Sequence, residues 1–309
     1  MRKNTTAGCE SITLSCGGGL GNQMFAYAAG CYFAQRLQCA LEVIRPLRRQ
    51  QNFRGFGRPF HLDCFRIEAQ VREASALDRL FFSASPKAAA LQKWLGPLLR
   101  AQRGDERAAY HFDPPLENFV RRHCYLNGYW QAAGYVEPVR ERILREFQPR
   151  APLTGKAARW AQRIEQLPCP VAVHIRLGDY ELIHHATQNG RVSQVLPPDY
   201  YERALALVRS ELPGAALVVF SDEPEKARQR LSAAGECLFV EAGNADYEDL
   251  HLMSLCHHQV IANSSFSWWA AWLNQRPGRK VFAPRHWGNT PESYFPDLFP
   301  PDWRVIENL

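Results

Sequence analysis

The segment ITLSCGGGLGNQ, residues 12–23, decides the fold class of the first half of the chain. Its β-forming start, residues 12–16, runs into a series of glycines. A helical pattern of apolar residues follows over about 22–38, and a second β-like run occupies 40–43. Strand, glycine turn, helix and strand in this order predict a Rossmann-like βαβ unit.

The second half of the chain alternates apolar runs with helical patterns. Strands are predicted at 171–175, 216–220, 238–240, 260–261 and 280–283, and helices at 198–211, 224–234, 247–256 and 265–273. Strands that are almost wholly apolar and alternate with helices indicate a parallel sheet covered on both faces. In the middle of the chain, helices are predicted at 74–82, 86–101 and 135–147.

The chain length of 309 residues fits two domains of about 150 residues each. The stretch 148–152, QPRAP, has the composition of a linker. We therefore predict an α/β protein with domains at 1–150 and 151–309. Two Rossmann-like domains of this kind would face each other across a cleft between the carboxyl ends of their strands.

Charge is distributed unevenly over a chain whose formal net charge is +6. Residues 1–150 hold 22 Lys and Arg against 13 Asp and Glu, whereas residues 151–309 hold 15 against 18. A basic half indicates an anionic partner (nucleic acid, acidic glycan or a phosphate-linked lipid) or a well-solvated Arg-rich surface. No apolar run approaches the roughly 18 residues of a membrane span, so we expect any membrane association to be peripheral.

The cysteines exclude two common classes of small-site architecture. There are nine, and no two are spaced as CxxC, which fits neither a disulfide scaffold nor a zinc ribbon. Several stand among apolar residues and are expected to be small buried hydrophobes in a reducing cytoplasm. The histidine pairs at 184–185 and 257–258 point apart within their elements, and no DxD sequence is present, so we expect no metal site.

The segment HIRLGDY, residues 174–180, ends a predicted strand. Side chains alternate along a strand, so His174 and Arg176 share one face and Leu177 lies on the other. The guanidinium of Arg176 is suited to a diphosphate, although a surface salt bridge would use the same residue. Asp222, at the end of the next predicted strand, could accept hydrogen bonds from a ribose or a guanine, or cap the following helix.

Two further segments carry groups that could bind a phosphate or a sugar. In the glycine turn, Gly19 and Gly21 would let the backbone approach a ligand, and Asn22 and Gln23 add side-chain donors; a purely structural turn is the alternative. In NSSFSWW, residues 263–269, two serines could cap a helix or bind phosphate oxygens, and the tryptophans are expected to be packing residues.

Together these segments resemble the α-1,2-fucosyltransferases, particularly the bacterial ones. GGLGNQMF at 18–25 is similar to that family's first signature, and residues 174–180 are similar to its HxRRGDY motif. FSD at 220–222, residues 263–269 and GYWQ at 128–131 follow the same family order, and the resemblance extends from about residue 12 to residue 290. Leu177 replaces the second Arg of the motif, which puts a second cationic contact in doubt.

The resemblance implies a GT-B-like fold and inverting transfer of L-fucose from GDP-β-L-fucose to the 2-hydroxyl of a galactoside, with no metal cofactor. It assigns the acceptor to the N-terminal domain and the nucleotide to the C-terminal domain. The expected partners are GDP-fucose and a galactose-containing glycan, either lipid-linked, as in an O-antigen or capsule repeat, or free, as in lactose. No nucleic-acid partner is expected, and the expected location is the cytoplasm or the inner face of the membrane.

The resemblance also assigns roles to individual residues. His174 and Asp222 would contact guanosine, and Arg176 and Ser265 would hold the diphosphate. Apart from the resemblance, we expect catalysis to rest on Arg176 and on Asp179 as the base, with Glu181 and His184 as the next candidates; Asp179 could equally brace the loop or pair with Arg176. The full donor-binding set is Gly19, Gly21, Asn22, Gln23, His174, Arg176, Asp222, Ser264, Ser265 and Phe266, and the acceptor-side set is Tyr129, Trp130 and Gln131.

Three other functions are compatible with the sequence. One is transfer from another GDP-sugar on the same fold. The second is RNA binding, suggested by the basic half and by RGFGR at 54–58, although the aromatic strand pattern that should follow is missing. The third is binding of a GDP-sugar without turnover.

Overall fold

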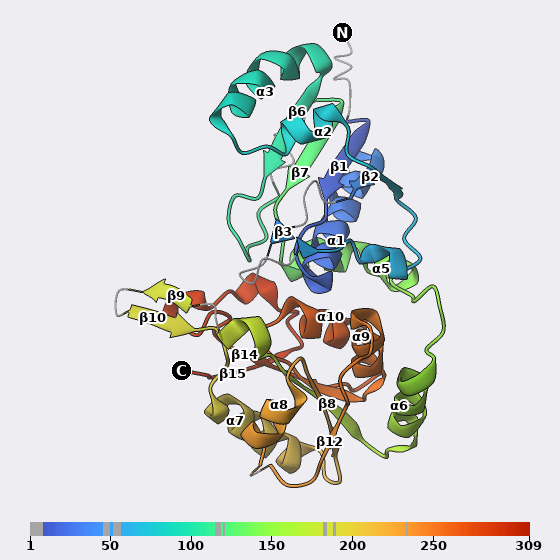
Figure 1. Ribbon diagram of the computed structural model, residues 1–309, viewed down its shortest axis with the longest axis vertical. Helices are drawn as coiled ribbons and strands as arrows, with labels where there is room; N and C mark the ends of the chain where they lie inside the picture. Colours follow the sequence, from blue (N-terminus) through green and yellow to red (C-terminus); the bar gives the residue numbers. More distant parts are fainter. Residues whose placement is uncertain are drawn as a thin grey trace, which may run out of the picture. The chain divides into compact units, whose positions relative to one another are not determined.

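The computed structural model divides the chain into two compact units, residues 1–148 and 149–309 (Figure 1). It describes residues 9–45, 50–51, 57–114, 119, 121–181, 184–187, 190–232 and 234–309. Each unit contains its own parallel sheet with helices beside it. The predicted α/β class with two Rossmann-like sheets is therefore confirmed, and the roles predicted for the two domains stay predictions.

The sheet of the first unit has the strand order β5-β2-β1-β7-β6, and every neighbouring pair is parallel. Its strands are β1 (Ser11–Ser15), β2 (Ala40–Ile44), β5 (Gln70–Arg72), β6 (Ala101–Asp105) and β7 (His123–Asn127). Only β1 and β2 were predicted as strands. The other three contain more polar residues, so they lack the apolar run that identifies a buried strand.

Helix α1 (Leu20–Leu37) connects β1 to β2 and is buried over most of its length. It lies close to the sheet because Gly30 has no side chain. A Cβ at this position would lie 2.2 Å from Cδ2 of Leu14 in β1 and 2.9 Å from Cδ1 of Leu41 in β2. The predicted βαβ unit is thus confirmed, with the glycine turn directly before α1.

The remaining elements of the first unit are shorter. They are β3 (Gln50–Gln51), β4 (Gly57–Arg58), α2 (Ala76–Phe81), α3 (Pro86–Leu99), α4 (Ala133–Val136), α5 (Arg140–Glu146), and 3₁₀ turns at Leu62–Cys64 and Glu137–Val139. The single helix predicted at 135–147 is wrong: a 3₁₀ turn separates α4 from α5. Pro138 lies in that turn, where its missing N–H interrupts the helical hydrogen bonds.

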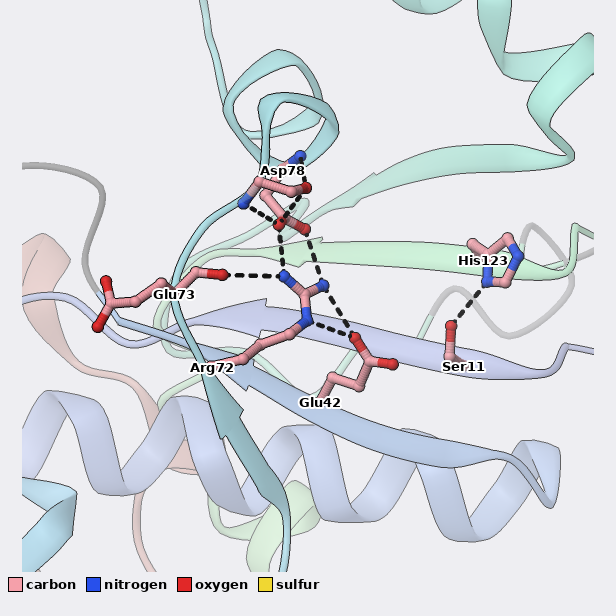
Figure 2. Close-up of polar contacts among 7 residues, drawn as sticks. Ser11, Glu42, Arg72, Glu73, Asp78 and His123 are labelled. Atoms are coloured by element: carbon pink, nitrogen blue, oxygen red, sulfur yellow. Dashed lines mark hydrogen bonds and ion pairs between the residues drawn. The ribbon is translucent and has the colours of Figure 1, made fainter.

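A partly buried ionic network around the buried Asp78 fixes the start of α2 to the sheet (Figure 2). Arg72, at the end of β5, donates to Asp78 over 2.5 and 3.0 Å and to Glu42 of β2 over 2.8 Å. Burial alone would raise the pKa of Asp78, but its bonds to Arg72 and Ser75 outweigh burial and lower it. At the amino end of the same sheet, Ser11 Oγ lies 2.8 Å from His123 Nδ1 and joins β1 to β7.

The sheet of the second unit has the order β12-β11-β8-β13-β14-β15 and is also parallel throughout. Its strands are β8 (Pro170–Ile175), β11 (Ala216–Ser221), β12 (Cys237–Phe239), β13 (His258–Val260), β14 (Val281–Pro284) and β15 (Arg304–Ile306). The strands predicted for this half are all present, with ends shifted by no more than two residues. Strand β15 was not predicted.

Helices cover the sheet of the second unit. Figure 1 shows α7 and α8 on one side of it and α9 and α10 on the other. They are α6 (Gly155–Gln166), α7 (Pro198–Glu211), α8 (Pro224–Arg230), α9 (Asp246–Leu255) and α10 (Ser265–Leu273). Two short strands, β9 (His184–Thr187) and β10 (Gly190–Ser193), form a hairpin, and 3₁₀ turns lie at Gly178–Glu181, Pro291–Ser293 and Pro296–Leu298. The core between β8 and α7 includes Val173, Tyr200 and Ala204.

All nine cysteines are free thiols, and five of them are buried, as the sequence predicted for small apolar side chains. Among the described residues, no helix combines the length and the apolar character that a membrane span requires.

Candidate functional site

Three neighbouring strands of the second unit end at one edge of the sheet. Strand β8 lies between β11 and β13. The chain adds β11 and β12 on one side of β8 and then crosses to β13 on the other, so the strand order reverses beside β8. Open α/β sheets bind ligands at such a reversal, outside the carboxyl ends of the strands. Arg176, Asp222 and Asn263 follow these three strands and therefore stand at this edge.

Arg176 is held by two carboxylates at this edge. Its Nη2 lies 2.7 Å from Asp179 Oδ1, and its Nη1 lies 3.2 Å from Asp222 Oδ2. Its Cζ lies 5.4 Å from the centre of the Tyr180 ring. Burial would lower the pKa of the guanidinium, but the neighbouring carboxylates outweigh burial and raise it. Arg176 is therefore a fixed, fully charged group with 21% of its side chain exposed.

The backbone after β8 shapes the position of Asp222. The Leu177 N–H donates to Asp222 Oδ1 over 3.0 Å. A Cβ on Gly178 would lie 2.3 Å from Asp222 Oδ2, so only glycine leaves room for this carboxylate. Leu177 itself is fully buried in the core, on the face opposite Arg176, as predicted from strand alternation. Asp222 is not the cap of α8, since the N-cap residue of that helix is Glu223.

His174 is the buried polar group of the cluster, with 4% of its surface exposed. Its Nδ1 has no hydrogen-bond partner among the described residues. Burial, with a smaller effect of Arg176, lowers its pKa to about 3, so the imidazole is neutral near pH 7. Its ring centre lies 5.8 Å from that of Phe266. Buried polar atoms are normally hydrogen-bonded, so a ligand is the natural partner of this nitrogen.

The loop between β13 and α10 is tied to the same cluster. The Tyr180 hydroxyl donates to the Asn263 carbonyl over 3.2 Å, and Asn263 Nδ2 donates to the carbonyls of Gln194 and Trp287. Ser264 is the N-cap residue of α10, but its side chain makes no capping bond. Ser265 follows as the first residue of the helix. Trp268 and Trp269 are fully buried and are confirmed as packing residues.

The first unit has an equivalent edge, because its strand order reverses between β1 and β7. The glycine turn follows β1, and residues 128–131 follow β7. Gln131 Nε2 donates to Asn22 Oδ1 over 3.0 Å, and a Cβ on Gly18 would lie 3.3 Å from the Tyr129 ring. The structure therefore brings the predicted glycine turn and the predicted acceptor segment together. Gly19 is the N-cap residue of α1, and Gly21 is buried in its first turn.

Two predicted binding residues of this unit are internal supports in the structure. The Gln23 amide is fully buried: it donates to the carbonyls of Gly18 and Pro59, each over 2.9 Å, and accepts from the His61 N–H. Trp130 is 1% exposed and packs edge-on against Phe33. Their contribution to a ligand site is therefore to hold its loops.

Glu106, which follows β6, is a residue of this edge that was not predicted from the sequence. Its carboxylate accepts from the backbone N–H groups of Tyr129 and Trp130 over 2.9 and 3.0 Å. Burial raises the pKa of Glu106 although these bonds oppose the shift. The loop turns sharply to direct its N–H groups at one carboxylate, with φ of +146° at Gly128 and +56° at Trp130. Nothing in the sequence indicated this contact, because β6 itself was not recognised.

A second buried carboxylate that was not predicted from the sequence is Asp249, in the first turn of α9 after β12. Asn244 Nδ2 donates to its carboxylate over 2.8 Å, and burial raises its pKa to about 6. Its position at the start of a helix that follows a predicted strand was a signal that could have identified it.

The other predicted candidates are less central to the cluster. Glu181 pairs with Lys226 over 2.6 Å. The side chain of His184 and most of the segment 54–58 lie outside the described residues. Within the described part of the chain, no three His, Cys, Asp or Glu side chains form a group that could hold a metal ion.

A family model matches more than half of the chain. Residues 116–307 match the model of glycosyl transferase family 11. The chain is 30% identical to the O-antigen biosynthesis glycosyltransferase WbnK of Escherichia coli over 87% of this chain and 92% of that protein. It is 27% identical to an alpha-1,2-colitosyltransferase of Escherichia coli over 94% of this chain and 97% of that protein. A solved structure of an Arabidopsis thaliana FUT1 mutant in complex with GDP aligns with 94% of this chain and 75% of that chain, at 12% identity and a TM-score of 0.49.

Proposed function

Because the chain belongs to glycosyl transferase family 11, we propose that it is a galactoside α-1,2-fucosyltransferase of the GT-B type. It transfers L-fucose from GDP-β-L-fucose to the 2-hydroxyl of a galactoside, with inversion and without a metal ion. The observation that carries the proposal is the cluster at the edge of the second sheet. There Arg176 is fixed between Asp179 and Asp222, near His174, whose Nδ1 has no partner in the described part of the chain.

The cluster suits a nucleoside diphosphate. Neutral His174 and the aromatic ring of Phe266 offer a hydrogen-bonding nitrogen and an apolar face to guanosine, with Asp222 as an acceptor. Arg176 and the first N–H groups of α10, at Ser264 and Ser265, offer positive charge to the phosphates.

Departure of GDP builds negative charge on the β-phosphate, and Arg176 is the described cation placed to stabilise it. Preorganised donors of this kind contribute about 2.7–4 kcal/mol each to the transition state. The two carboxylates contact Nη1 and Nη2 of Arg176, where a phosphate oxygen would compete with them. Exchange of Asp179 for a phosphate oxygen would release that carboxylate to accept the proton of the attacking hydroxyl. Donor binding and activation of the base are then one event.

The edge of the first sheet suits the acceptor. Asn22 and Tyr129 carry amide and hydroxyl groups, which match the hydroxyls of a sugar. The buried Gln131 donates to Asn22 and positions it, and Glu106 fixes the loop that carries Tyr129 and Gln131. This assigns the acceptor to the N-terminal domain, 1–150, and the donor to the C-terminal domain, 151–309. The relative WbnK is named for O-antigen biosynthesis, which supports a surface-glycan acceptor. The proposed site of synthesis is the cytoplasm.

The direct test is release of GDP from GDP-fucose with EDTA present, with and without lactose, while the product mass is measured. Acceptor-dependent release and a product one deoxyhexose heavier would support the proposal. Donor binding without release would leave the donor assignment intact and exclude lactose as an acceptor. Absence of both binding and release would refute the proposed donor.

A second candidate donor is favoured by one comparison, since a relative matched over 94% of the chain is a colitosyltransferase. Competition between GDP-fucose and a colitosyl donor for the same acceptor would rank the two. A kcat/KM higher for the colitosyl donor would replace fucose in the proposal and leave the rest unchanged.

The role of Asp179 is tested by Asp179→Asn. Loss of a general base should lower kcat by about 10²–10⁴. GDP affinity should be unchanged or tighter, because a carboxylate that competes for Arg176 is removed. A residue that merely braced the loop would instead weaken GDP binding, and an unchanged kcat would remove Asp179 as the base.

A further inference from the structure

Helix α3 (Pro86–Leu99) of the first unit has two apolar faces, and only one of them is covered. Its inner face packs on β6 and α2 and includes the buried Ala88 and Gly96. Gly96 permits the close approach, because a Cβ there would lie 2.8 Å from the Ala101 carbonyl oxygen. Figure 1 shows α3 beside β6, the edge strand of this sheet. The helix therefore projects its other face away from the sheet.

The outward face carries large apolar side chains. Leu91, Trp94 and Leu98 are 47%, 73% and 76% exposed, and their spacing places them on one stripe of the helix. Leu77 of the neighbouring α2 is also exposed, at 43%. Isolated exposed apolar residues are ordinary, but a contiguous stripe that includes a tryptophan marks an interaction surface.

The charge around this stripe has one sign. Residues 79–104 contain five Lys and Arg and no Asp or Glu. Lys87 lies on the same stripe as Leu91, and Lys93 is the neighbour of Trp94 in sequence; both side chains are exposed, whereas Arg103 pairs with Asp105. The stripe is therefore apolar at its centre and cationic around it.

We propose that this surface, Leu91, Trp94 and Leu98 with Lys87 and Lys93, binds the surface of a membrane that contains anionic phospholipid. Leucine and tryptophan side chains enter the boundary between headgroups and acyl chains, and lysines interact with the phosphates above it. A second copy of the chain fits less well. A twofold contact would bring identical cationic stripes together with no acidic residue between 79 and 104 to compensate.

The inference does not depend on which sugar the protein transfers. It predicts that the chain floats with vesicles of phosphatidylglycerol and phosphatidylcholine, but not with vesicles of phosphatidylcholine alone, and that salt weakens the binding. Trp94 supplies a direct signal, since the other seven tryptophans are at most 7% exposed. A blue shift of tryptophan emission on binding would therefore report Trp94.

The test uses the whole chain and variants of exposed side chains. The double variant Trp94→Gln/Leu98→Gln should lower the partition coefficient at least about tenfold. Lys87→Gln and Lys93→Gln should each lower it about fivefold. Leu309→Gln and Arg159→Gln are matched controls in the second unit: Leu309 is 50% exposed, close to the 47% of Leu91, and Arg159 is an exposed cation. Turnover of soluble substrates should be unchanged in all of these variants.

Two results would overturn the proposal. One is failure of the wild-type chain to bind anionic vesicles, or binding that the Trp94 and Leu98 changes leave intact. The other is a dimer in sedimentation velocity that Trp94→Gln abolishes in the absence of vesicle binding, which would make a second copy the occupant. Loss of transferase activity without loss of vesicle binding would count against the proposed function only.

Discussion

Removal of the Arg176 side chain is the perturbation that the structure of the site makes most informative. Arg176→Ala leaves Asp179 and Asp222 beside each other without the cation that now lies 2.7 and 3.2 Å from them. It also removes the charge placed to meet the diphosphate. Two separate effects are therefore expected, one on stability and one on the rate of transfer.

The effect on stability is moderate because the three side chains are partly exposed, at 21%, 17% and 25%. Loss of one partner from a fully buried ion pair costs about 3–5 kcal/mol, and from an exposed pair at most about 1 kcal/mol. The present case lies between these limits, at roughly 2 kcal/mol. The loss of transition-state stabilisation should exceed the loss of stability: kcat should fall 10²–10³-fold, which corresponds to about 2.7–4 kcal/mol.

The assay measures GDP release at saturating donor together with the denaturation midpoint of the same preparation, so that activity is compared only where the protein is folded. Arg176→Lys is the matched variant, since it keeps the charge but cannot reach both carboxylates with one planar group. It should recover part of the stability and only a small part of kcat. If Arg176→Ala is folded and turns over within threefold of wild type, Arg176 does not stabilise the leaving group and the assignment of this edge as the donor site is refuted.

Three further predictions concern neighbouring positions. Gly178→Ala should weaken GDP binding about tenfold, because its Cβ would displace the Asp222 carboxylate oxygen 2.3 Å away. In a double-mutant cycle, the loss of GDP affinity should be little greater in Gly178→Ala/Asp222→Asn than in Asp222→Asn alone. Full additivity would contradict the contact. Glu106→Gln should lower the free energy of unfolding by about 1–3 kcal/mol, since one backbone N–H loses its hydrogen-bond acceptor. The KM for the sugar acceptor should rise while GDP affinity is unchanged. Asp105→Asn, one residue away and exposed, serves as the control. The pKa of His174 falls from 6.5 to about 3 on folding, so at pH values between these two the unfolded chain binds one more proton than the folded chain, and the free energy of unfolding falls as pH falls. Between pH 7 and pH 5, the free energy of unfolding of the wild type should fall by roughly 2 kcal/mol more than that of His174→Gln. Equal losses would show that the imidazole is not buried.

The side chains at the strand ends could be predicted from the sequence, because alternation along a strand depends only on neighbouring residues. Alternation along β8 placed Leu177 in the core and Arg176 on the opposite face, and the structure confirms both. The apolar strands of the second half were identified because parallel strands buried on both faces leave an unbroken apolar run. The strands β5, β6 and β7 of the first unit lack that run, and the sequence did not reveal them.

What the sequence could not supply is which strand ends become neighbours. Arg176 meets Asp222 because β11 pairs with β8, a choice made by the order of strands in the sheet. That order also explains why residue 178 is glycine, since it must leave room for the carboxylate of Asp222, which lies 44 positions further along the chain.

The same limit applies to the first unit. The amide of Gln23 was predicted to face a ligand from the start of a helix, but its hydrogen bonds go to Gly18 in the glycine turn and to the backbone of Pro59 and His61. Glu106 became part of the site only because β6 pairs with β7. Periodicity and residue type act within a few positions, so the class of fold and the chemical groups at the strand ends follow from the sequence. Which of those groups meet depends on strand order, and strand order is set by burial and pairing between segments that are distant along the chain.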